Sequence, residues 1–379
     1  MIDANAFLAL LQSHGVGFFA GVPDSLLSPL SAQLLETVPA DRHIIAANEG
    51  SALALVAGYH LATGAVGCAY MQNSGLTNAI SPLTSLLDAE VYSVPALLVI
   101  GWRGEMVAGK QLKDEPQHAK MGRITLDLLS CLEIPHAVLH AEAEDVAECV
   151  ERILACARTQ SRPVALVVRQ GTFSGDAVAT TASPCALTRE EALAAVIGAL
   201  PDDAVVVSTT GKVSRELYEL RVARGEQPYG DFLTVGSMGH ALQIASGVAL
   251  ARPEKTVVCI DGDGALIMHM GGLATSAALP NLVHIVMNNG AHESVGGQPT
   301  NGFLIDMPGL ARACGYAAAW RACEAGEVAR VIAQALSARR SSFVEIRTSA
   351  TSRHDLSRPK GSPREAKRVF MHRIGVVQE

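Results

Sequence analysis

The stretch that decides the fold is IDGDGALIMHMGGLATSAALPNLVHIVMNNGAHESV, residues 260–295. It starts at the end of an apolar run, 256–260, that predicts a buried strand, and then turns through a Gly-Asp-Gly sequence centred on Asp263. An apolar helix is expected next, followed by a strand at 282–287 that leads to Asn289. Because ligands of open α/β sheets bind at the carboxyl ends of the strands, the carboxylate and the carboxamide should meet at that edge.

The oxygen atoms of this stretch suggest a site for Mg²⁺ and a diphosphate. Mg²⁺ is usually held by one or two protein carboxylates together with phosphate oxygens and water. Asp263, Asn289 and a backbone carbonyl just after Asn289 would supply such ligands, and Gly262 and Gly264 would let phosphates approach the backbone closely. An ordinary strand-to-helix turn explains Gly-Asp-Gly equally well when it is taken alone. The asparagine pair after the next strand favours the metal site.

Two other phosphate-binding motifs are excluded by the neighbouring residues. A dinucleotide-binding fingerprint would need a glycine where Ile267 stands. Gly211-Lys212 resembles the end of a P-loop, but Val206 replaces its first glycine and Val213 its Ser/Thr. We therefore expect neither a Rossmann NAD site nor a P-loop.

The composition indicates an α/β protein, and we expect it to be cytoplasmic. The 379 residues are 49% hydrophobic but only 4% aromatic, which is typical of buried parallel strands covered by helices. A net charge of −7 argues against nucleic acid as a partner, and no apolar run is long enough to span a membrane. The eight cysteines show no zinc-binding or Cys-x-x-Cys spacing, so we expect free thiols in a reducing compartment.

Strands and helices alternate at short spacing in both halves of the chain, which predicts two doubly wound parallel-sheet domains. The first should cover residues 1–170 and the second residues 188–379. The segment 171–187 is rich in Gly, Ser, Thr and Ala and is expected to be the linker. Residues 101–123 are expected to form a long polar loop, either functional or a solvated excursion.

Three polar side chains of the first half follow predicted strands. Asp24 and Ser25 either cap the next helix or mark a place where an anionic substrate group binds. Glu49 stands in the first turn of an apolar helix, where the helix dipole favours a carboxylate. Without further evidence, the presence of a glutamate here is explained by its place at the start of a helix.

Gly-Asp-Gly, followed after a helix and a strand by Asn-Asn, resembles the diphosphate-binding motif of thiamin diphosphate enzymes. The resemblance implies the thiamin diphosphate-binding fold, with a pyrimidine domain followed by a pyrophosphate domain, and Mg²⁺ held by Asp263, Asn289 and the backbone of Ala291. It also implies that Glu49 hydrogen bonds N1′ of the aminopyrimidine ring and so favours the tautomer that deprotonates the thiazolium. Met238 matches the apolar residue that props the cofactor in its bent shape, although a flexible core residue is the alternative. The cofactor-binding residues implied are Glu49, Asn73, Gly236, Ser237, Met238, Gly262, Asp263, Gly264, Ala265 and Asn289.

Further segments resemble one group of these enzymes, the phosphonopyruvate decarboxylases, with the sulfopyruvate decarboxylases as close relatives. The segments are GVPDSLL at 21–27, NEG at 48–50, GWRGE, KDEPQH and MG between 101 and 122, NNGAHESVGGQPT at 288–300 and RHDLSRP at 353–359. The resemblance implies non-oxidative decarboxylation of 3-phosphonopyruvate to phosphonoacetaldehyde and CO₂. The spacing of residues 106–112 does not map securely onto the family.

A doubly anionic 2-oxo acid needs cationic partners and a proton donor. The candidate substrate-binding residues are Asp24, Ser25, Lys113, Arg353 and Arg358, and the candidate proton donors are His118 and His292. For each of these, surface solvation or local pairing is the alternative.

The resemblance also bears on assembly and on other functions. Because the family seats its cofactor between domains of two subunits, it implies at least a homodimer. A sulfopyruvate decarboxylase remains an alternative, and so does a carboligase of the acetolactate synthase kind, although those enzymes usually carry a middle domain that this chain has no room for. A non-catalytic cofactor-binding protein is disfavoured by the intact Glu49, Asp263 and Asn289.

Overall fold

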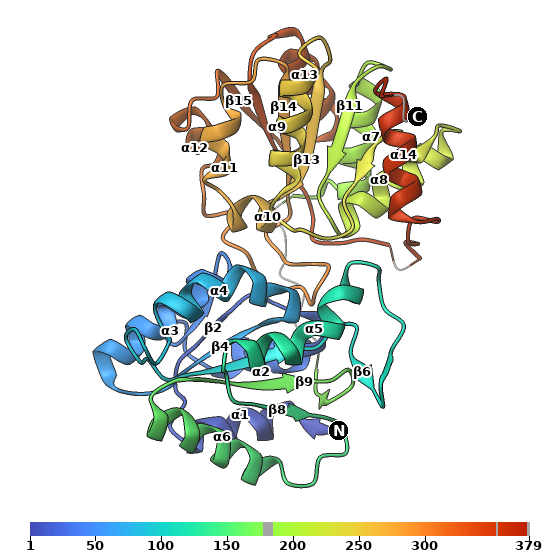
Figure 1. The fold of residues 1–379 in the computed structure, drawn as a ribbon. Coiled ribbons are helices and arrows are strands. Elements are labelled where there is room, and N and C mark those ends of the chain that lie inside the picture. Colours follow the sequence, from blue (N-terminus) through green and yellow to red (C-terminus); the bar gives the residue numbers. More distant parts are fainter. Residues whose placement is uncertain (177–184, 354, 377–379) are drawn as a thin grey trace. The chain divides into compact units, whose positions relative to one another are not determined.

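The computed structural model describes residues 1–176, 185–353 and 355–376. The chain divides into two compact units (Figure 1). The N-terminal unit comprises Met1–Ala179 with Val295–Gln298, and the C-terminal unit comprises Thr180–Ser294 with Pro299–Glu379. Of the predicted linker 171–187, residues 177–184 lie outside the described residues.

The N-terminal unit is built on a six-stranded parallel sheet. In spatial order the strands are β3 (His43–Ile45), β2 (Phe19–Gly21), β4 (Gly67–Gln72), β5 (Ala96–Gly101), β9 (Pro163–Val168) and β8 (His136–Leu139). Alternate residues of each strand face opposite sides, so Leu97 and Val99 join one apolar cluster while Leu98 and Ile100 join the other. The first cluster is covered by α1 (Ala4–Ser13), α2 (Ser28–Thr37) and α6 (Val146–Gln160), and the second by α3 (Glu49–Thr63), α4 (Leu76–Ser85) and α5 (His118–Cys131).

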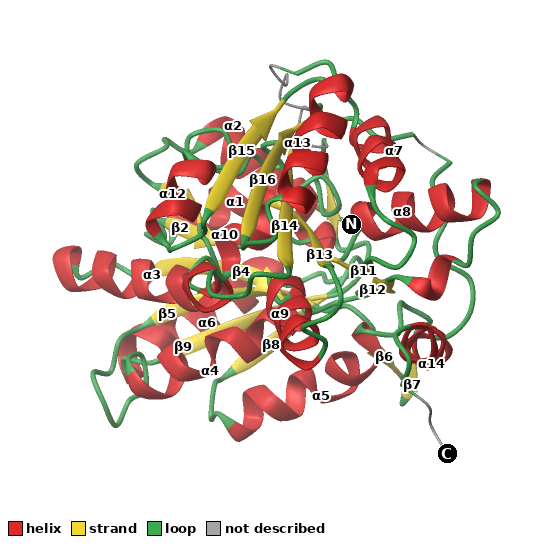
Figure 2. Cartoon of the chain, turned by 90° about the horizontal axis from the view of Figure 1, so that it is seen from above, coloured by secondary structure: helices red, strands yellow, loops and turns green. Residues whose placement is uncertain are grey.

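The C-terminal unit repeats this plan. Its parallel strands are, in spatial order, β12 (Phe232–Leu233), β11 (Val205–Ser208), β13 (Val257–Gly262), β14 (Leu282–Asn288), β16 (Ser342–Arg347) and β15 (Ala318–Ala322). One face is covered by α7 (Arg189–Ala199), α8 (Lys212–Ala223) and α13 (Ala325–Ser337). The other is covered by α9 (Ala241–Ala251), α10 (Asp263–Met268), α11 (Gly272–Ser276), α12 (Met307–Ala313) and α14 (Pro363–Arg373). The strands β13, β14 and β16 run next to one another (Figure 2). Two parallel sheets, each covered by helices on both faces, confirm the predicted fold class.

The secondary structure differs from the expectation in several places, three of them in segments that the sequence singles out. The segment 101–123 is not one long loop, because it contains the hairpin of β6 (Met106–Val107) and β7 (Lys110–Gln111) and the start of α5. The helix expected after Asp263 is broken into α10 and α11 by a turn that includes Gly271, a residue that weakens helices. Within the segment 171–187, β10 (Phe173–Ser174) pairs in parallel with β1 (Ile2–Asp3).

Short 3-10 helices complete the described elements: η1 (Ser25–Leu27), η2 (Asn73–Gly75) and η3 (Pro228–Gly230). The helix η2 directly follows β4, and η1 follows β2 after a three-residue turn, so both carry polar residues at the carboxyl edge of the N-terminal sheet. Within the described part of the chain, no helix combines the length and the apolar content needed to cross a bilayer.

Candidate active site

Asp263 is a buried carboxylate at the carboxyl end of β13. It is the first residue of α10, and only 3% of its surface is exposed. Burial raises its pKa to about 6, although hydrogen bonds from the Thr300 hydroxyl and from nearby backbone N–H groups oppose the shift. A Cβ atom on Gly302 would lie 2.6 Å from Asp263 Oδ2, so this carboxylate needs glycine opposite it. A bound cation would favour the ionised form that burial disfavours.

The two asparagines that follow β14 have different surroundings. Asn288 is fully buried, and its Nδ2 donates to the Gly302 carbonyl and to Glu345 Oε1, both at 2.8 Å. Asn289 donates from Nδ2 to Glu293 Oε2 at 3.1 Å, and its Oδ1 accepts from the Ala291 N–H at 3.1 Å. The first asparagine therefore holds the loop together, while the second presents its carboxamide beside Ala291.

The oxygens gathered here fit a hard cation. The backbone N–H of Asn289 hydrogen bonds the Asp263 carboxylate, which places the two residues in contact. Asp263, Asn289 and Ala291 are each less than a tenth exposed. Carboxylate, carboxamide and carbonyl oxygens are the ligand types that Mg²⁺ prefers, and no thiol or imidazole is part of this set.

The loop before α9 packs against the same turn. A Cβ on Gly239, whose φ is +84°, would lie 3.1 Å from the Ala265 carbonyl oxygen. A Cβ on Gly264 would lie 3.3 Å from Met238 Cε and 2.9 Å from His292 Cε1. The structure thus brings together most of the predicted residues of the C-terminal unit, which are Met238, Gly262, Asp263, Gly264, Ala265, Asn289, Ala291 and His292. Gly236 and Ser237 lie on the loop that leads to Met238.

His292 is half-buried, and burial lowers its pKa to about 4. Its neutral form therefore predominates at pH 7. To donate a proton near neutral pH, the ring would first have to be protonated, and a nearby anionic ligand would favour that imidazolium form.

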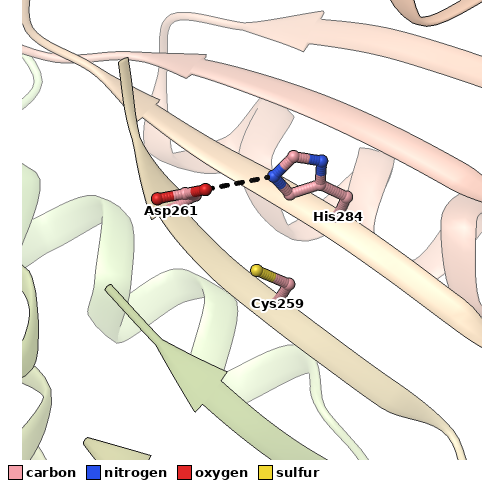
Figure 3. A group of neighbouring side chains, drawn as sticks. All are labelled: Cys259, Asp261 and His284. Carbon is pink, nitrogen blue, oxygen red and sulfur yellow. Dashed lines mark ion pairs between the residues drawn. The ribbon is translucent and has the colours of Figure 1, made fainter. Parts of the chain in front are cut away.

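A second buried cluster lies beneath the Gly-Asp-Gly turn. Figure 3 shows Cys259 and Asp261 on β13 and His284 on the neighbouring strand β14. Their ligand atoms lie within 4.8 Å of one another, and His284 Nε2 is 3.7 Å from Asp261 Oδ2. Asp261 Oδ1 accepts from the Gly262 N–H at 2.9 Å. The buried Asp–His pair therefore holds the first residue of the turn that carries Asp263.

Glu49 lies at the start of α3 in the N-terminal unit and is 6% exposed. The cap of this helix is Asn48, whose side chain accepts from the Ser51 N–H at 2.9 Å, so Glu49 is not needed as a cap. Its Oε2 accepts from Asn78 Nδ2 at 2.9 Å. Burial raises the pKa of Glu49, with the Asn78 hydrogen bond acting against the shift. A Cβ on Gly75 would come within 2.4 Å of Glu49 Oε1, so the carboxyl occupies a space that only glycine leaves open.

Asp24 is a second buried carboxylate of the N-terminal unit. Its Oδ2 caps η1 by accepting from the Leu26 N–H at 3.1 Å, while Oδ1 has no hydrogen-bond partner among the described residues. A Cβ on Gly101 would lie 2.0 Å from Oδ2, which shows how tightly the end of β5 is packed against it. Burial raises the pKa of Asp24 to about 6, although the charge of Arg103 acts against the shift.

Arg103 joins several of these residues and was not predicted as a site residue. Its guanidinium donates from Nε to Asp114 Oδ2 at 2.8 Å and from Nη1 to Ser25 Oγ at 2.9 Å. Asp114 is partly buried, but the hydrogen bonds from Arg103 and from the Glu115 N–H hold its pKa well below the usual range. The one sequence signal for Arg103 is its position two residues after the end of β5, at the carboxyl edge of the sheet.

The remaining predicted residues are placed as follows. Asn73 is buried, and its Nδ2 donates to the Arg103 carbonyl at 3.0 Å and to Thr125 Oγ1 at 2.9 Å. His118 is buried as the first residue of α5, and Lys113 is exposed on the preceding loop. Arg353, in the C-terminal unit, is paired with Glu190, Glu219 and Asp355. It would have to leave these acids to bind a substrate anion, and Arg358 is exposed on the same segment.

The burial of Asp24 leads to a prediction about stability. A carboxyl whose folded-state pKa lies above its unfolded value stabilises the fold below the unfolded pKa, near 4, and loses that contribution as the pH rises through about 6. Asp24→Asn should therefore stabilise the cofactor-free protein at pH 8 by up to about 3 kcal/mol, because one pKa unit corresponds to about 1.4 kcal/mol. The difference should disappear below pH 4. Scanning calorimetry across this pH range measures both.

The matched control is Asp3→Asn. Asp3 also caps a helix through its carboxylate, accepting from the Ala6 N–H at 2.8 Å, but it is exposed. Its substitution should not give a stability gain that grows with pH. Equal melting temperatures of wild type and Asp24→Asn at pH 8 would show that the Asp24 charge is not destabilising.

Comparisons with known proteins agree with the geometry of both units. Residues 3–121 match the thiamine pyrophosphate enzyme N-terminal TPP binding domain, and residues 209–346 match the C-terminal TPP binding domain. The chain is 38% identical to the phosphonopyruvate decarboxylase of Streptomyces viridochromogenes over 98% of this chain and 94% of that protein. It is 37% identical to that of Streptomyces hygroscopicus over 98% and 93%. It is 28% identical to the sulfopyruvate decarboxylase of Methanosarcina acetivorans over 81% of each chain.

The two matched domains define the class, which is that of the thiamine pyrophosphate enzymes. Within that class the likeness extends over nearly the whole length of two relatives that share one name. The chain belongs to the phosphonopyruvate decarboxylase family of thiamin diphosphate-dependent decarboxylases.

Proposed function

We propose that this protein catalyses the non-oxidative decarboxylation of 3-phosphonopyruvate to phosphonoacetaldehyde and CO₂, using thiamin diphosphate and Mg²⁺. The observation that carries the proposal is the 38% identity to a phosphonopyruvate decarboxylase over 98% of the chain. The buried carboxylates Glu49 and Asp263 support it, because the resemblance to thiamin diphosphate enzymes implies an acid at each of these two positions.

In the C-terminal unit, Asp263, Asn289 and the Ala291 carbonyl would hold Mg²⁺, which would neutralise the negative charge of the cofactor's diphosphate. The backbone of Gly262 and Gly264 would approach the phosphates. Met238 would pack against the cofactor from the loop that contacts Gly264. We assign residues 188–379 to the pyrophosphate domain, residues 1–170 to the pyrimidine domain and 171–187 to the linker.

Glu49 would hold a proton between its carboxyl and N1′ of the aminopyrimidine ring. Its raised pKa suits that task, because a group that shares a proton works best when its pKa is close to that of its partner. Asn78 and the space beside Gly75 keep the carboxyl in one orientation. The bound cofactor supplies the electron sink for the pair released when the carboxylate leaves as CO₂.

The N-terminal unit would also provide contacts for the substrate. Ser25 and Asp24 lie together at the carboxyl edge of its sheet, where Arg103 supplies a positive charge. Lys113, Arg353 and Arg358 remain candidates for the anionic groups, and Asn73 for contact with the cofactor. After CO₂ leaves, a proton must be added at the former carbonyl carbon, and His118 and His292 are the candidate donors.

A sulfopyruvate decarboxylase is the second candidate function, supported by the 28% identity over 81% of the chain. The two substrates differ in the charge of their terminal group. A side-by-side assay of phosphonopyruvate, sulfopyruvate and pyruvate, scored by aldehyde released, separates the functions. We expect kcat/KM to be highest for phosphonopyruvate. A higher kcat/KM for sulfopyruvate would make the protein a sulfopyruvate decarboxylase. A kcat/KM for pyruvate equal to that for phosphonopyruvate would show that the enzyme is not specific for the phosphonate.

We further propose that the enzyme is at least a homodimer, with each cofactor held by the pyrimidine domain of one subunit and the pyrophosphate domain of another, as in the family. A cytoplasmic location is supported by the eight cysteines, all of them among the described residues and all free thiols, as is usual in a reducing compartment.

A further inference from the structure

The side chain of Glu293 is the centre of a partly buried hydrogen-bond network beside Asn289. Its Oε2 accepts from Asn289 Nδ2 at 3.1 Å and from Arg189 Nη1, and its Oε1 accepts from Lys212 Nζ at 2.9 Å. Arg189 in turn makes two hydrogen bonds of 2.7 Å to Glu216, whose side chain is 1% exposed. The carboxylate of Glu293 is therefore fixed from two sides before it meets Asn289.

The network determines which way the Asn289 carboxamide faces. A carboxylate paired with arginine and lysine has only acceptor atoms, so the group of Asn289 that points toward it must be the NH₂. The carbonyl oxygen Oδ1 then points the other way, where it accepts from the Ala291 N–H. A carbonyl oxygen has two lone pairs, so this contact leaves one free for a further partner.

We propose that Glu293 is a positioning residue that turns the Asn289 carboxamide so that Oδ1, rather than Nδ2, is presented to Mg²⁺. This inference rests on the proposed function, because it assumes that Mg²⁺ binds beside Asp263 and Asn289. Without the carboxylate, the amide could rotate and turn its NH₂ group toward the cation. An amide NH₂ group cannot act as a metal ligand. Arg189 and Lys212 act one step further away by fixing Glu293.

The test is the affinity for Mg²⁺ at saturating thiamin diphosphate, measured by isothermal titration calorimetry. Glu293→Gln keeps the shape of the side chain but can present an NH₂ to Asn289. We expect Mg²⁺ to bind about 10–100-fold more weakly, the usual effect of losing a residue that orients a metal ligand. The midpoint of thermal unfolding without cofactor checks that the variant is folded.

The same substitution made in the Asn289→Asp variant distinguishes a positioning role of Glu293 from a purely structural one. In Asn289→Asp both side-chain oxygens can be ligands, so orientation no longer matters, while the new charge is repelled by Glu293. Adding Glu293→Gln to Asn289→Asp should therefore leave Mg²⁺ affinity unchanged or raise it, the opposite of its effect on the wild type. A residue that merely held the fold together would lower the affinity in both backgrounds.

Two further variants keep the test decisive. Glu293→Asp keeps a negative charge for Arg189 and Lys212, but its shorter side chain withdraws the carboxylate from Asn289, so it should also weaken Mg²⁺ binding. It serves as the test variant if Glu293→Gln does not fold. Glu226→Gln, a control, removes an acid paired with Arg221 in the same unit and should leave the affinity unchanged. Wild type that binds no Mg²⁺ would refute the proposed function. If Glu293→Gln binds Mg²⁺ as tightly as wild type does, the proposed role of Glu293 is refuted. The role is also refuted if Glu293→Gln lowers Mg²⁺ affinity equally in the wild-type and Asn289→Asp backgrounds.

Discussion

Glu49→Gln should lower the turnover of phosphonopyruvate by about 10²–10⁴-fold, the usual size of a lost acid–base contribution. Glutamine has nearly the same shape and can still accept from Asn78, so the start of α3 should be preserved. It has no titratable proton to share with N1′ of the aminopyrimidine. Binding of thiamin diphosphate and Mg²⁺ should therefore remain close to that of the wild type while kcat falls. Steady-state kinetics and calorimetric titration measure the two effects separately.

The matched control is Glu148→Gln. Glu148 is also a glutamate in the first turn of a helix of the N-terminal unit, but it is exposed on α6. Its substitution should leave both turnover and cofactor binding unchanged. Near-normal turnover of Glu49→Gln would show that Glu49 has no part in the reaction.

Asp263→Ala should abolish the Mg²⁺-dependent binding of thiamin diphosphate. The carboxylate is the one negatively charged side chain among the proposed ligands, so its loss leaves only neutral oxygens for the cation. In wild type, cofactor and metal together at 100 times the dissociation constant should stabilise the fold by about 2.7 kcal/mol. In the variant that stabilisation should vanish. Thermal unfolding with thiamin diphosphate, with and without Mg²⁺, measures the difference.

The control for this variant is Asp203→Ala, which removes an exposed acid of the same unit that pairs with Lys255 at 3.4 Å. It should retain the full stabilisation by cofactor and metal. Tight, Mg²⁺-dependent binding by Asp263→Ala would mean that the metal is held elsewhere.

Much of the fold was predictable because buried parallel strands appear in the sequence as short apolar runs. The strand β13 and the strand β14, with the Asn-Asn sequence after it, were expected within two residues of their observed bounds. The edge strand β15 was missed, since Arg321 interrupts its apolar residues and is exposed. The polar helix α14, which buries only Phe370, gave no apolar period either.

The candidate site was predictable where its residues directly follow strands, as Asp263 and Asn289 do. The contacts that support these residues were not, because they join distant parts of the chain. Thr300 and Asp263 are 37 residues apart, and Arg189 and Glu293 are 104 apart. No local pattern connects such pairs. The acids that surround Arg353 were hidden for the same reason, so its positive charge looked more available in the sequence than it is in the structure.

The most direct test of the central claim is the stoichiometry of the reaction of the wild-type protein with 3-phosphonopyruvate. With thiamin diphosphate and Mg²⁺ present, we expect one CO₂ and one phosphonoacetaldehyde for each substrate consumed, and no reaction when thiamin diphosphate is left out. Unchanged phosphonopyruvate in the presence of protein with bound cofactor, or CO₂ release that does not depend on thiamin diphosphate, would contradict the account.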